Sequence, residues 1–303
     1  MKLTHIRDVI AAAEHGSLRA AARHLGVAQP SITRSIREIE QELGAPLFER
    51  HQQGMRLTAV GQLFLRRALT VQAELRRAAE EVGQMQGANT GEVAIAMSAI
   101  STFALMPQAV RSFRQKYPKA VLKITESFFQ AVSTQVLDGH LDFYVGPYSD
   151  EIRQSQIVVE QLFTNERVVI ARKGHDLARA TSLEQLKSAD WVKQALPDRS
   201  SEGDFERRFA EAGVPRPNIV MHTTSVTATL LAVANSTLLT VIPRQVLTDP
   251  IAGSLFDVLP LRERLDAAPI CLVRRGDLSL TPLAEYLSDM MRRAAIPFQK
   301  KRG

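Results

Sequence analysis

The first fifty residues place apolar side chains at helical spacing, in segments that glycines separate. Residues 18–25 are rich in alanine and therefore have a high helix propensity. Gly26 follows the last apolar residue, where a left-handed C-cap is favoured, and Pro30 falls in the first turn of the next segment, where its missing N–H costs nothing. The apolar residues of that segment recur at spacings of four, three and four positions: Ile32, Ile36, Ile39 and Leu43. The pattern predicts two short helices joined by a tight turn, which is how a helix-turn-helix DNA reader is built.

The face opposite the apolar stripe carries side chains that suit DNA recognition. Glutamine pairs bidentately with adenine, arginine pairs with guanine, and serine or threonine contacts bases or phosphates. The residues on this face are Gln29, Ser31, Thr33, Arg34 and Arg37. The alternative is an ordinary helical hairpin with a solvated polar face, which the turn chemistry and the exposed residue types make less favourable.

A short hairpin is predicted directly after these helices. Residues 47–50 and 55–58 flank the polar, glycine-containing stretch 51–54, as two short strands joined by a turn would. Arg50 and Arg56 would then lie near the phosphate backbone of DNA, and a solvated loop is the alternative interpretation of this segment.

Together these motifs resemble the N-terminal part of the LysR-type transcriptional regulators, and the resemblance extends along nearly the whole chain. The stretches that carry it are 16–22, 29–31, 39–40, 43–44, 46–50 and 57–61. We add Ser17, Arg19 and Pro30 to the predicted DNA-contacting residues. Ala28 departs from the family pattern, which usually has serine there; the helix N-cap that this serine would form is worth about 1 kcal/mol.

A long amphipathic helix is predicted over residues 59–87, followed by a hinge at 88–91. Its apolar residues keep a spacing close to a heptad repeat: Val60, Phe64, Ala68, Val71, Leu75, Ala78, Val82 and Met85. Such a stripe needs a partner, and an antiparallel copy from a second chain is the one that the family resemblance implies. Packing on the chain's own second domain is the alternative.

Beyond the hinge, strands and helices alternate, which predicts parallel α/β units. This half resembles the effector domain of the same family, which is similar to type II periplasmic binding proteins. The expected fold is therefore α/β with an all-α N-terminal part: a winged helix-turn-helix domain at 1–58, the linker helix, effector subdomain I at 92–163 and 269–303, and effector subdomain II at 164–268. Asp176 and the stretch 235–237 depart from the family pattern, and the variant resembles a subgroup that includes the toluenesulfonate-degradation regulator.

The ligand cleft of such a fold lies outside the carboxyl ends of the strands, at helix N-termini. Two hydroxyl-rich clusters occupy such places and suit a carboxylate or sulfonate: Ser98, Ala99, Ile100, Ser101 and Thr102, and Thr223, Thr224 and Ser225. Simple capping of their own helices is the alternative role. Phe128, Phe129 and Tyr148 could enclose an apolar or aromatic body or belong to the core, Gly146 is placed beside them, and the polar loop that contains Arg199, Ser200 and Ser201 should border the cleft.

Composition adds limits to this interpretation. The net charge of +6 permits nucleic-acid binding, but it is divided evenly between the first 90 residues and the rest.

The single Cys271 excludes an intramolecular disulfide, and no signal peptide or long apolar run occurs, so we expect a cytoplasmic protein with no membrane association. No hydrolase, P-loop or metalloprotease motif is present, which argues against an enzyme, a metal site or a cofactor.

The sequence therefore predicts a ligand-responsive transcription regulator that binds double-stranded DNA and a small organic anion. We expect it to pair with itself through the linker helix and to form a tetramer, with RNA polymerase as a further partner. The alternative is a solute-binding protein or an enzyme with an accessory helical domain, for which a secretion signal or a catalytic constellation would be expected.

Overall fold

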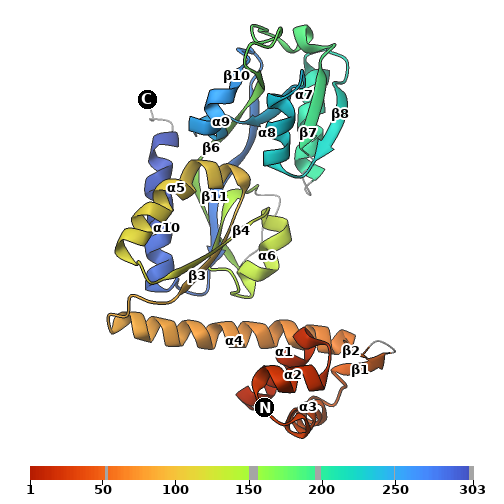
Figure 1. Cartoon of the computed structure of the whole chain (residues 1–303), viewed down its shortest axis with the longest axis vertical. Helices are drawn as coiled ribbons and strands as arrows, with labels where there is room; N and C mark the ends of the chain where they lie inside the picture. Colours follow the sequence, from red (N-terminus) through yellow and green to blue (C-terminus); the bar gives the residue numbers. More distant parts are fainter. Residues whose placement is uncertain (52–53, 150–155, 195–198, 249, 300–303) are drawn as a thin grey trace. The chain divides into compact units, whose positions relative to one another are not determined.

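The computed structural model describes residues 1–51, 54–149, 156–194, 199–248 and 250–299, and the chain divides into two compact units (Figure 1). The first unit consists of residues 1–88 with 134–140. The second consists of the described residues in 89–133 and from 141 onwards. Each unit is considered by itself below.

The first unit contains three helices, a hairpin and a long helix. The elements are α1 (Leu3–His15), α2 (Leu18–Leu25), α3 (Gln29–Leu43), β1 (Phe48–His51), β2 (Gly54–Leu57) and α4 (Ala59–Met85). Helix α1 was not predicted from the sequence, and its buried residues Val9, Ala11 and Ala12 join Ile32 and Ile36 of α3 in one apolar core. The tight turn predicted between α2 and α3 is present, because Gly26 adopts φ 65° and its N–H bonds the carbonyls of Ala22 and Arg23.

Helix α4 begins at the predicted residue, 59, and ends at Met85, two residues before the predicted end. Thr58 caps it by accepting a bond from the N–H of Gly61 at 2.9 Å. Phe64 and Ala68, two members of the predicted stripe, pack on Ile6 and Ile10 of α1 within the chain. The other members of the stripe are exposed, and the exposed fraction is 56% at Val82 and 80% at Met85. They are Val60, Val71, Leu75, Ala78, Val82 and Met85.

The second unit is an α/β assembly. Its helices are α5 (Ala99–Lys116), the first part of α6 (Phe129–Leu137), α7 (Arg199–Glu211), α8 (Val226–Ala234), α9 (Pro250–Leu255) and α10 (Pro282–Ala295), with short 3-10 helices at Leu183–Leu186, Arg244–Thr248 and Ile296–Phe298. Its strands are β3 (Glu92–Met97), β4 (Val121–Glu126), β5 (Phe143–Pro147), β6 (Ile157–Arg172), β7 (Asp190–Gln194), β8 (Asn218–Thr223), β9 (Thr240–Pro243), β10 (Phe256–Val258) and β11 (Leu265–Arg275).

Two long strands connect the halves of this unit. The main sheet has the order β10-β6-β11-β5-β3-β4, with β9 also paired to β6, and β7 and β8 form a separate parallel pair. Strands β3, β4 and β5 are parallel, whereas β6 and β11 run antiparallel to their neighbours. The register between β6 and β11 shifts between Ala267 and Ile270, and at this point the two strands cross from one half to the other.

Each half has its own core. The first gathers around Ile95, Phe113 and Leu272, between α5, α10 and the sheet. The second gathers around Trp191, Phe209 and Leu239, and a neighbouring cluster includes Ile170 and Val233. Each half therefore buries its own apolar clusters, and β6 and β11 contribute residues to both.

The structure corrects the sequence interpretation in this unit. The apolar run 168–171 predicts a strand, but β6 begins earlier, at Ile157, and its first half pairs with β11. Burial along that first half follows no regular alternation, so the sequence carries no period-2 signal there. The expected subdomain boundaries at 163/164 and 268/269 lie within β6 and β11, the two strands that connect the halves.

Candidate functional site

The polar face of α3 is the first candidate site. Ile32, Ser35, Ile36 and Ile39 are buried, and this leaves the opposite face to solvent. The predicted contact residues on that face are exposed, apart from the half-buried Thr33: Gln29, Pro30, Ser31, Arg34 and Arg37. Thr33 Oγ1 donates to the carbonyl of Gln29 at 3.1 Å, so its hydroxyl is engaged within the helix. The arrangement presents amide, hydroxyl and guanidinium groups together, as a major-groove reader requires.

Arg34 is held in place by a carboxylate on its own helix. Its Nε donates to Glu38 at 2.7 Å, and this bond holds the pKa of Glu38 below its usual value. Glu38 also faces Nε2 of the buried His5 at 3.2 Å. The Arg34 side chain remains 82% exposed, so it is oriented while it stays accessible.

The remaining predicted DNA contacts lie around this helix. Ser17 caps α2 by accepting from the N–H of Ala20 at 3.2 Å, and Arg19 is exposed on the first turn of α2. Strands β1 and β2 form the predicted hairpin, with Arg56 exposed opposite Glu49 and Arg50 opposite Met55; the side chain of Arg50 lies outside the described atoms. Residues 52–53 of the predicted turn lie outside the described residues.

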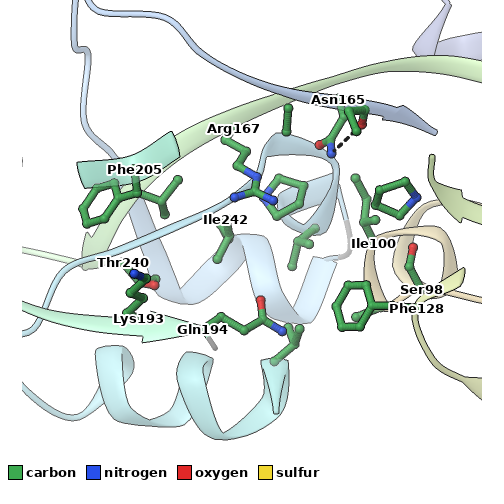
Figure 2. Close-up of a pocket in the computed structure, with 18 of the residues that line it drawn as sticks. Ser98, Ile100, Phe128, Asn165, Arg167, Lys193, Gln194, Phe205, Thr240 and Ile242 are labelled. Atoms are coloured by element: carbon green, nitrogen blue, oxygen red, sulfur yellow. Dashed lines mark hydrogen bonds between the residues drawn. The ribbon is translucent and has the colours of Figure 1, made fainter. Parts of the chain in front are cut away.

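A cavity of about 560 Å³ in the second unit is the second candidate site (Figure 2). Its walls come from both halves: Ser98, Ala99, Ile100, Phe128, Phe129 and Tyr148 line it from the first half, and β7, β9 and α7 contribute from the second. Ala267 and Ala268 of the crossover complete it. Its size and its mostly apolar walls with a few polar groups are typical of small-molecule sites.

The charged groups of the cavity are basic. Arg167 of β6, Lys193 of β7 and Arg207 of α7 line it, and no aspartate or glutamate does so among the described residues. Lys193 Nζ lies 2.9 Å from Glu206, which does not line the cavity, and the bond from Lys193 lowers the pKa of that carboxyl. Three cationic side chains that line one cavity favour an anionic ligand.

Helix α5 adds a second element that favours an anion. Ser98 caps the helix, and the N–H groups of Ala99 and Ile100 belong to its first turn, which leaves them without intrahelical acceptors. All three residues line the cavity. The helix N-terminus and the basic side chains therefore belong to one site.

The aromatic residues Phe128, Phe129 and Tyr148 also line the cavity. Phe129 packs edge-to-face on Tyr148, with their ring centroids 5.2 Å apart, and both are nearly buried. Phe129 and Tyr148 are therefore buried in the core and also form part of the cavity wall. The sequence left both positions open, and the two are compatible.

Several predicted ligand residues lie outside the cavity. Ser101 is fully buried beside Ser98, and Thr102 Oγ1 donates to the Ser98 carbonyl at 3.2 Å, so both stabilise the start of α5. Gly146 lies behind the wall, because its missing side chain makes room for the phenol of Tyr144, whose pKa is raised by burial.

The second hydroxyl cluster caps its own helix. Thr223 Oγ1 accepts from the N–H of Ser225 at 3.1 Å, and Ser225 Oγ accepts from Ala228 at 3.2 Å. Of this region only Val226 lines the cavity, whereas Thr223, Thr224 and Ser225 do not. In this structure Thr223 and Ser225 therefore form hydrogen bonds at the start of α8, which is the capping role that the sequence left as the alternative to ligand binding.

The predicted polar loop is helical where the structure describes it. Arg199, Ser200 and Ser201 form the first turn of α7, and their side chains lie outside the described atoms, as do residues 195–198. The polar residues that face the cavity instead were missed from the sequence: Asn165, Arg167, Lys193, Gln194, Arg207 and Thr240. Arg167 immediately precedes the apolar run 168–171, and a lone basic residue at the start of a buried strand was the available signal.

Within the part of the chain that the structure describes, no three histidine, cysteine or acidic residues come together as metal ligands would. No helix there has the length and hydropathy needed to cross a membrane.

Comparison with known proteins follows the same division of the chain. Residues 3–62 match the model of the bacterial regulatory helix-turn-helix proteins of the lysR family, and residues 86–296 match the LysR substrate binding domain. The transcriptional regulator TdcA of Escherichia coli K12 is 30% identical over 91% of this chain and 87% of its own length. The regulator PcaQ of Agrobacterium fabrum is 26% identical over 97% of this chain and 95% of its own length.

Solved structures with the same fold are full-length regulators. CbnR, described as a LysR family transcriptional regulator, superposes with a TM-score of 0.69 at 21% identity, over 97% of this chain and 99% of CbnR. A full-length variant of OxyR from Pseudomonas aeruginosa superposes with a TM-score of 0.71 at 21% identity, over 100% of this chain and 99% of OxyR. At these identities the likeness concerns the fold.

Proposed function

The chain belongs to the LysR family of bacterial helix-turn-helix regulators, and from this premise we propose which groups bind DNA and what its effector is. As a member it is a ligand-responsive, DNA-binding transcription regulator and not an enzyme. The proposal adds that α3 reads DNA through Gln29, Ser31, Arg34 and Arg37. It also adds that the cavity binds a small organic anion with an apolar or aromatic body.

The effector class rests on one observation: Arg167 and Lys193 line the same cavity as the N-terminus of α5, and no carboxylate lines it among the described residues. An anion placed there gains from both charges and from free N–H groups. The aromatic side chains favour an aromatic body, either a carboxylate or a sulfonate. A sulfonate effector would also agree with the resemblance to the subgroup of the toluenesulfonate-degradation regulator.

We propose that the regulator acts as a dimer through α4 and as a tetramer in the complete assembly. The exposed apolar residues Val71, Leu75 and Val82 support pairing, because a stripe of this kind is costly to leave in water. An anion that contacts both halves of the second unit would favour one orientation of the halves, and in an oligomer this would alter the spacing of the DNA-reading heads. Contact with RNA polymerase is part of the same proposal.

Calorimetry with benzoate and benzenesulfonate on the full chain tests the effector class. We expect Arg167→Gln to weaken the binding of either anion at least tenfold. Arg172→Gln changes an arginine of the same strand that does not line the cavity and should leave affinity unchanged. Failure of both anions to bind, or equal binding by the Arg167 variant, would contradict the proposed site.

Fluorescence anisotropy with DNA from upstream of the gene tests the reading helix. Arg37→Ala should lower specific affinity by about 5- to 150-fold, corresponding to roughly 1–3 kcal/mol, and binding should weaken as salt rises. Arg111→Ala, an exposed arginine of α5, is the control. Unchanged affinity of Arg37→Ala and Arg34→Ala would exclude α3 as the reader.

A further inference from the structure

Asn165 presents a buried hydrogen-bond acceptor to the cavity. It lies on β6 at the crossover, lines the cavity and is only 3% exposed. Its Nδ2 donates to the carbonyl of Ala268 at 3.2 Å, which joins the two crossover strands (Figure 2). Because the amide nitrogen is fixed by that bond, the other end of the side chain is the acceptor Oδ1. No described residue donates to Oδ1.

A buried oxygen such as Asn165 Oδ1 destabilises the protein unless it accepts a hydrogen bond. A buried carbonyl oxygen without a hydrogen bond loses about 1–3 kcal/mol relative to water, and native proteins keep few such groups. Two other polar groups of the cavity are already engaged: Ser98 Oγ lies 3.0 Å from Ser101 Oγ, and Thr240 Oγ1 donates to the Val192 carbonyl at 2.9 Å. Asn165 therefore differs from Ser98 and Thr240, because its Oδ1 can still accept a hydrogen bond from a ligand.

The partner must be a donor, and the charge of the cavity limits its type. An ammonium group could donate to Oδ1, but Arg167 and Lys193 would repel it at close range. A neutral hydroxyl donates without this penalty. Since Arg167, Lys193 and the α5 N-terminus take the anionic group, the hydroxyl must be a second function on the same molecule.

We propose that Asn165 is the specificity-determining residue of the effector site and that the effector is a hydroxylated organic acid, in which the acid group faces the basic side chains and a hydroxyl donates to Asn165 Oδ1. The inference rests on the proposed function of the cavity as an anion site. A site built to bond a hydroxyl discriminates strongly against an analogue that lacks it, because the site's own polar group is then left unpaired.

Calorimetry on the full-length protein with matched acids tests this proposal. The probes are benzoate against 2-, 3- and 4-hydroxybenzoate, and hexanoate against 2-hydroxyhexanoate and 2-aminohexanoate. We expect at least one hydroxylated acid to bind tenfold or more tightly than its parent, and 2-aminohexanoate to bind more weakly than 2-hydroxyhexanoate. Asn165→Leu should abolish the hydroxyl preference while the parent acid still binds, and Asn165→Thr, which keeps an oxygen acceptor, should retain part of it.

The outcomes separate the two proposals. If all the acids bind but none of the hydroxylated ones binds more tightly, the role of Asn165 is overturned and the anion site stands. A preference that persists in Asn165→Leu, or tighter binding of 2-aminohexanoate, also overturns it. If no acid binds, the anion site and the role of Asn165 both fail. The comparison of acids uses the unaltered protein, so the hydroxyl preference can be measured even if a variant does not fold.

Discussion

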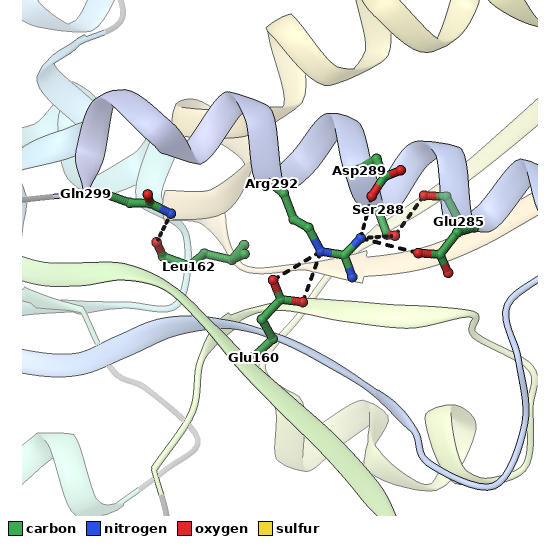
Figure 3. Close-up of polar contacts among 7 residues, drawn as sticks. All are labelled: Glu160, Leu162, Glu285, Ser288, Asp289, Arg292 and Gln299. Carbon is green, nitrogen blue, oxygen red and sulfur yellow. Dashed lines mark hydrogen bonds and ion pairs between the residues drawn. The ribbon is translucent and has the colours of Figure 1, made fainter.

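The guanidinium of Arg292 on α10 is bound to the carboxylate of Glu160 on β6, with Nε 3.1 and 3.0 Å from the two oxygens (Figure 3). The same guanidinium contacts Ser288, Asp289 and Glu285 along its own helix. The C-terminal helix is thus tied to the strand that crosses between the halves of the unit.

We expect Arg292→Gln to lower the free energy of unfolding by about 1 kcal/mol, since the group is only partly shielded from water and salt screens it. Urea unfolding of the full chain measures this change, and the double variant with Glu160→Gln should show a coupling of roughly 0.5–1 kcal/mol. Arg293→Gln, an exposed neighbour, is the control. Equal effects of the two arginine changes would mean that the link to β6 contributes nothing.

Gly61 has no room for a side chain. A Cβ there would overlap the carbonyl oxygen of Leu47, at the start of the hairpin. We expect Gly61→Ala to lower stability by about 1–3 kcal/mol and to weaken DNA binding, because α4 and the hairpin must separate. On the same helix, Gly83→Ala meets only the Ala88 Cβ at 3.8 Å and should stabilise the helix by about 0.5–1 kcal/mol. Thermal unfolding of the two variants compares them directly, and a harmless Gly61→Ala would contradict the close packing.

Asp142 is a structural carboxylate. Its Oδ2 accepts from the Ala94 N–H at 2.9 Å, and its own N–H donates to the Ala94 carbonyl at 2.7 Å. Asp142→Ala leaves a buried N–H without its acceptor and should cost about 1–3 kcal/mol in urea unfolding. Asp142→Asn keeps an acceptor and should cost less; the opposite order would argue against this role.

Ala28 leaves the start of α3 without a side-chain cap. It has the extended backbone of an N-cap residue, with φ −70° and ψ 137°, and it makes no side-chain bond. Ala28→Ser should raise the free energy of unfolding by about 1 kcal/mol, whereas Ala28→Val should not. Equal stability of all three proteins would show that the cap is supplied by another group.

The bond between Lys193 and Glu206 makes stability depend on pH in the acidic range. Because the bond from Lys193 holds the Glu206 pKa below its ordinary value of 4.5, its contribution is fully present above pH 4.5 and is lost as pH falls through the lower, folded-state pKa. Urea unfolding between pH 7 and 3 should show a steeper loss for the natural protein than for Glu206→Gln. Parallel curves would mean that the pair does not contribute.

Local chemistry allowed much of this fold to be predicted. The glycine turn before α3 and the start of α4 at residue 59 follow from neighbouring residues, which is why the sequence predicted them. Strand β6 was predicted only over residues 168–171, because its partner β11 lies about a hundred residues away in the chain.

The sequence by itself determined the class of protein, the helix-turn-helix with the exposed polar face of α3, and the helix N-terminus at Ser98. Only the tertiary structure decided which side chains face the cavity. Asn165, Arg167 and Lys193 come together because β6 crosses between the halves and β7 lies beside β9. Such contacts depend on long-range pairing, for which no periodicity in the chain is a signal, whereas helices and caps are stabilised by residues a few positions apart.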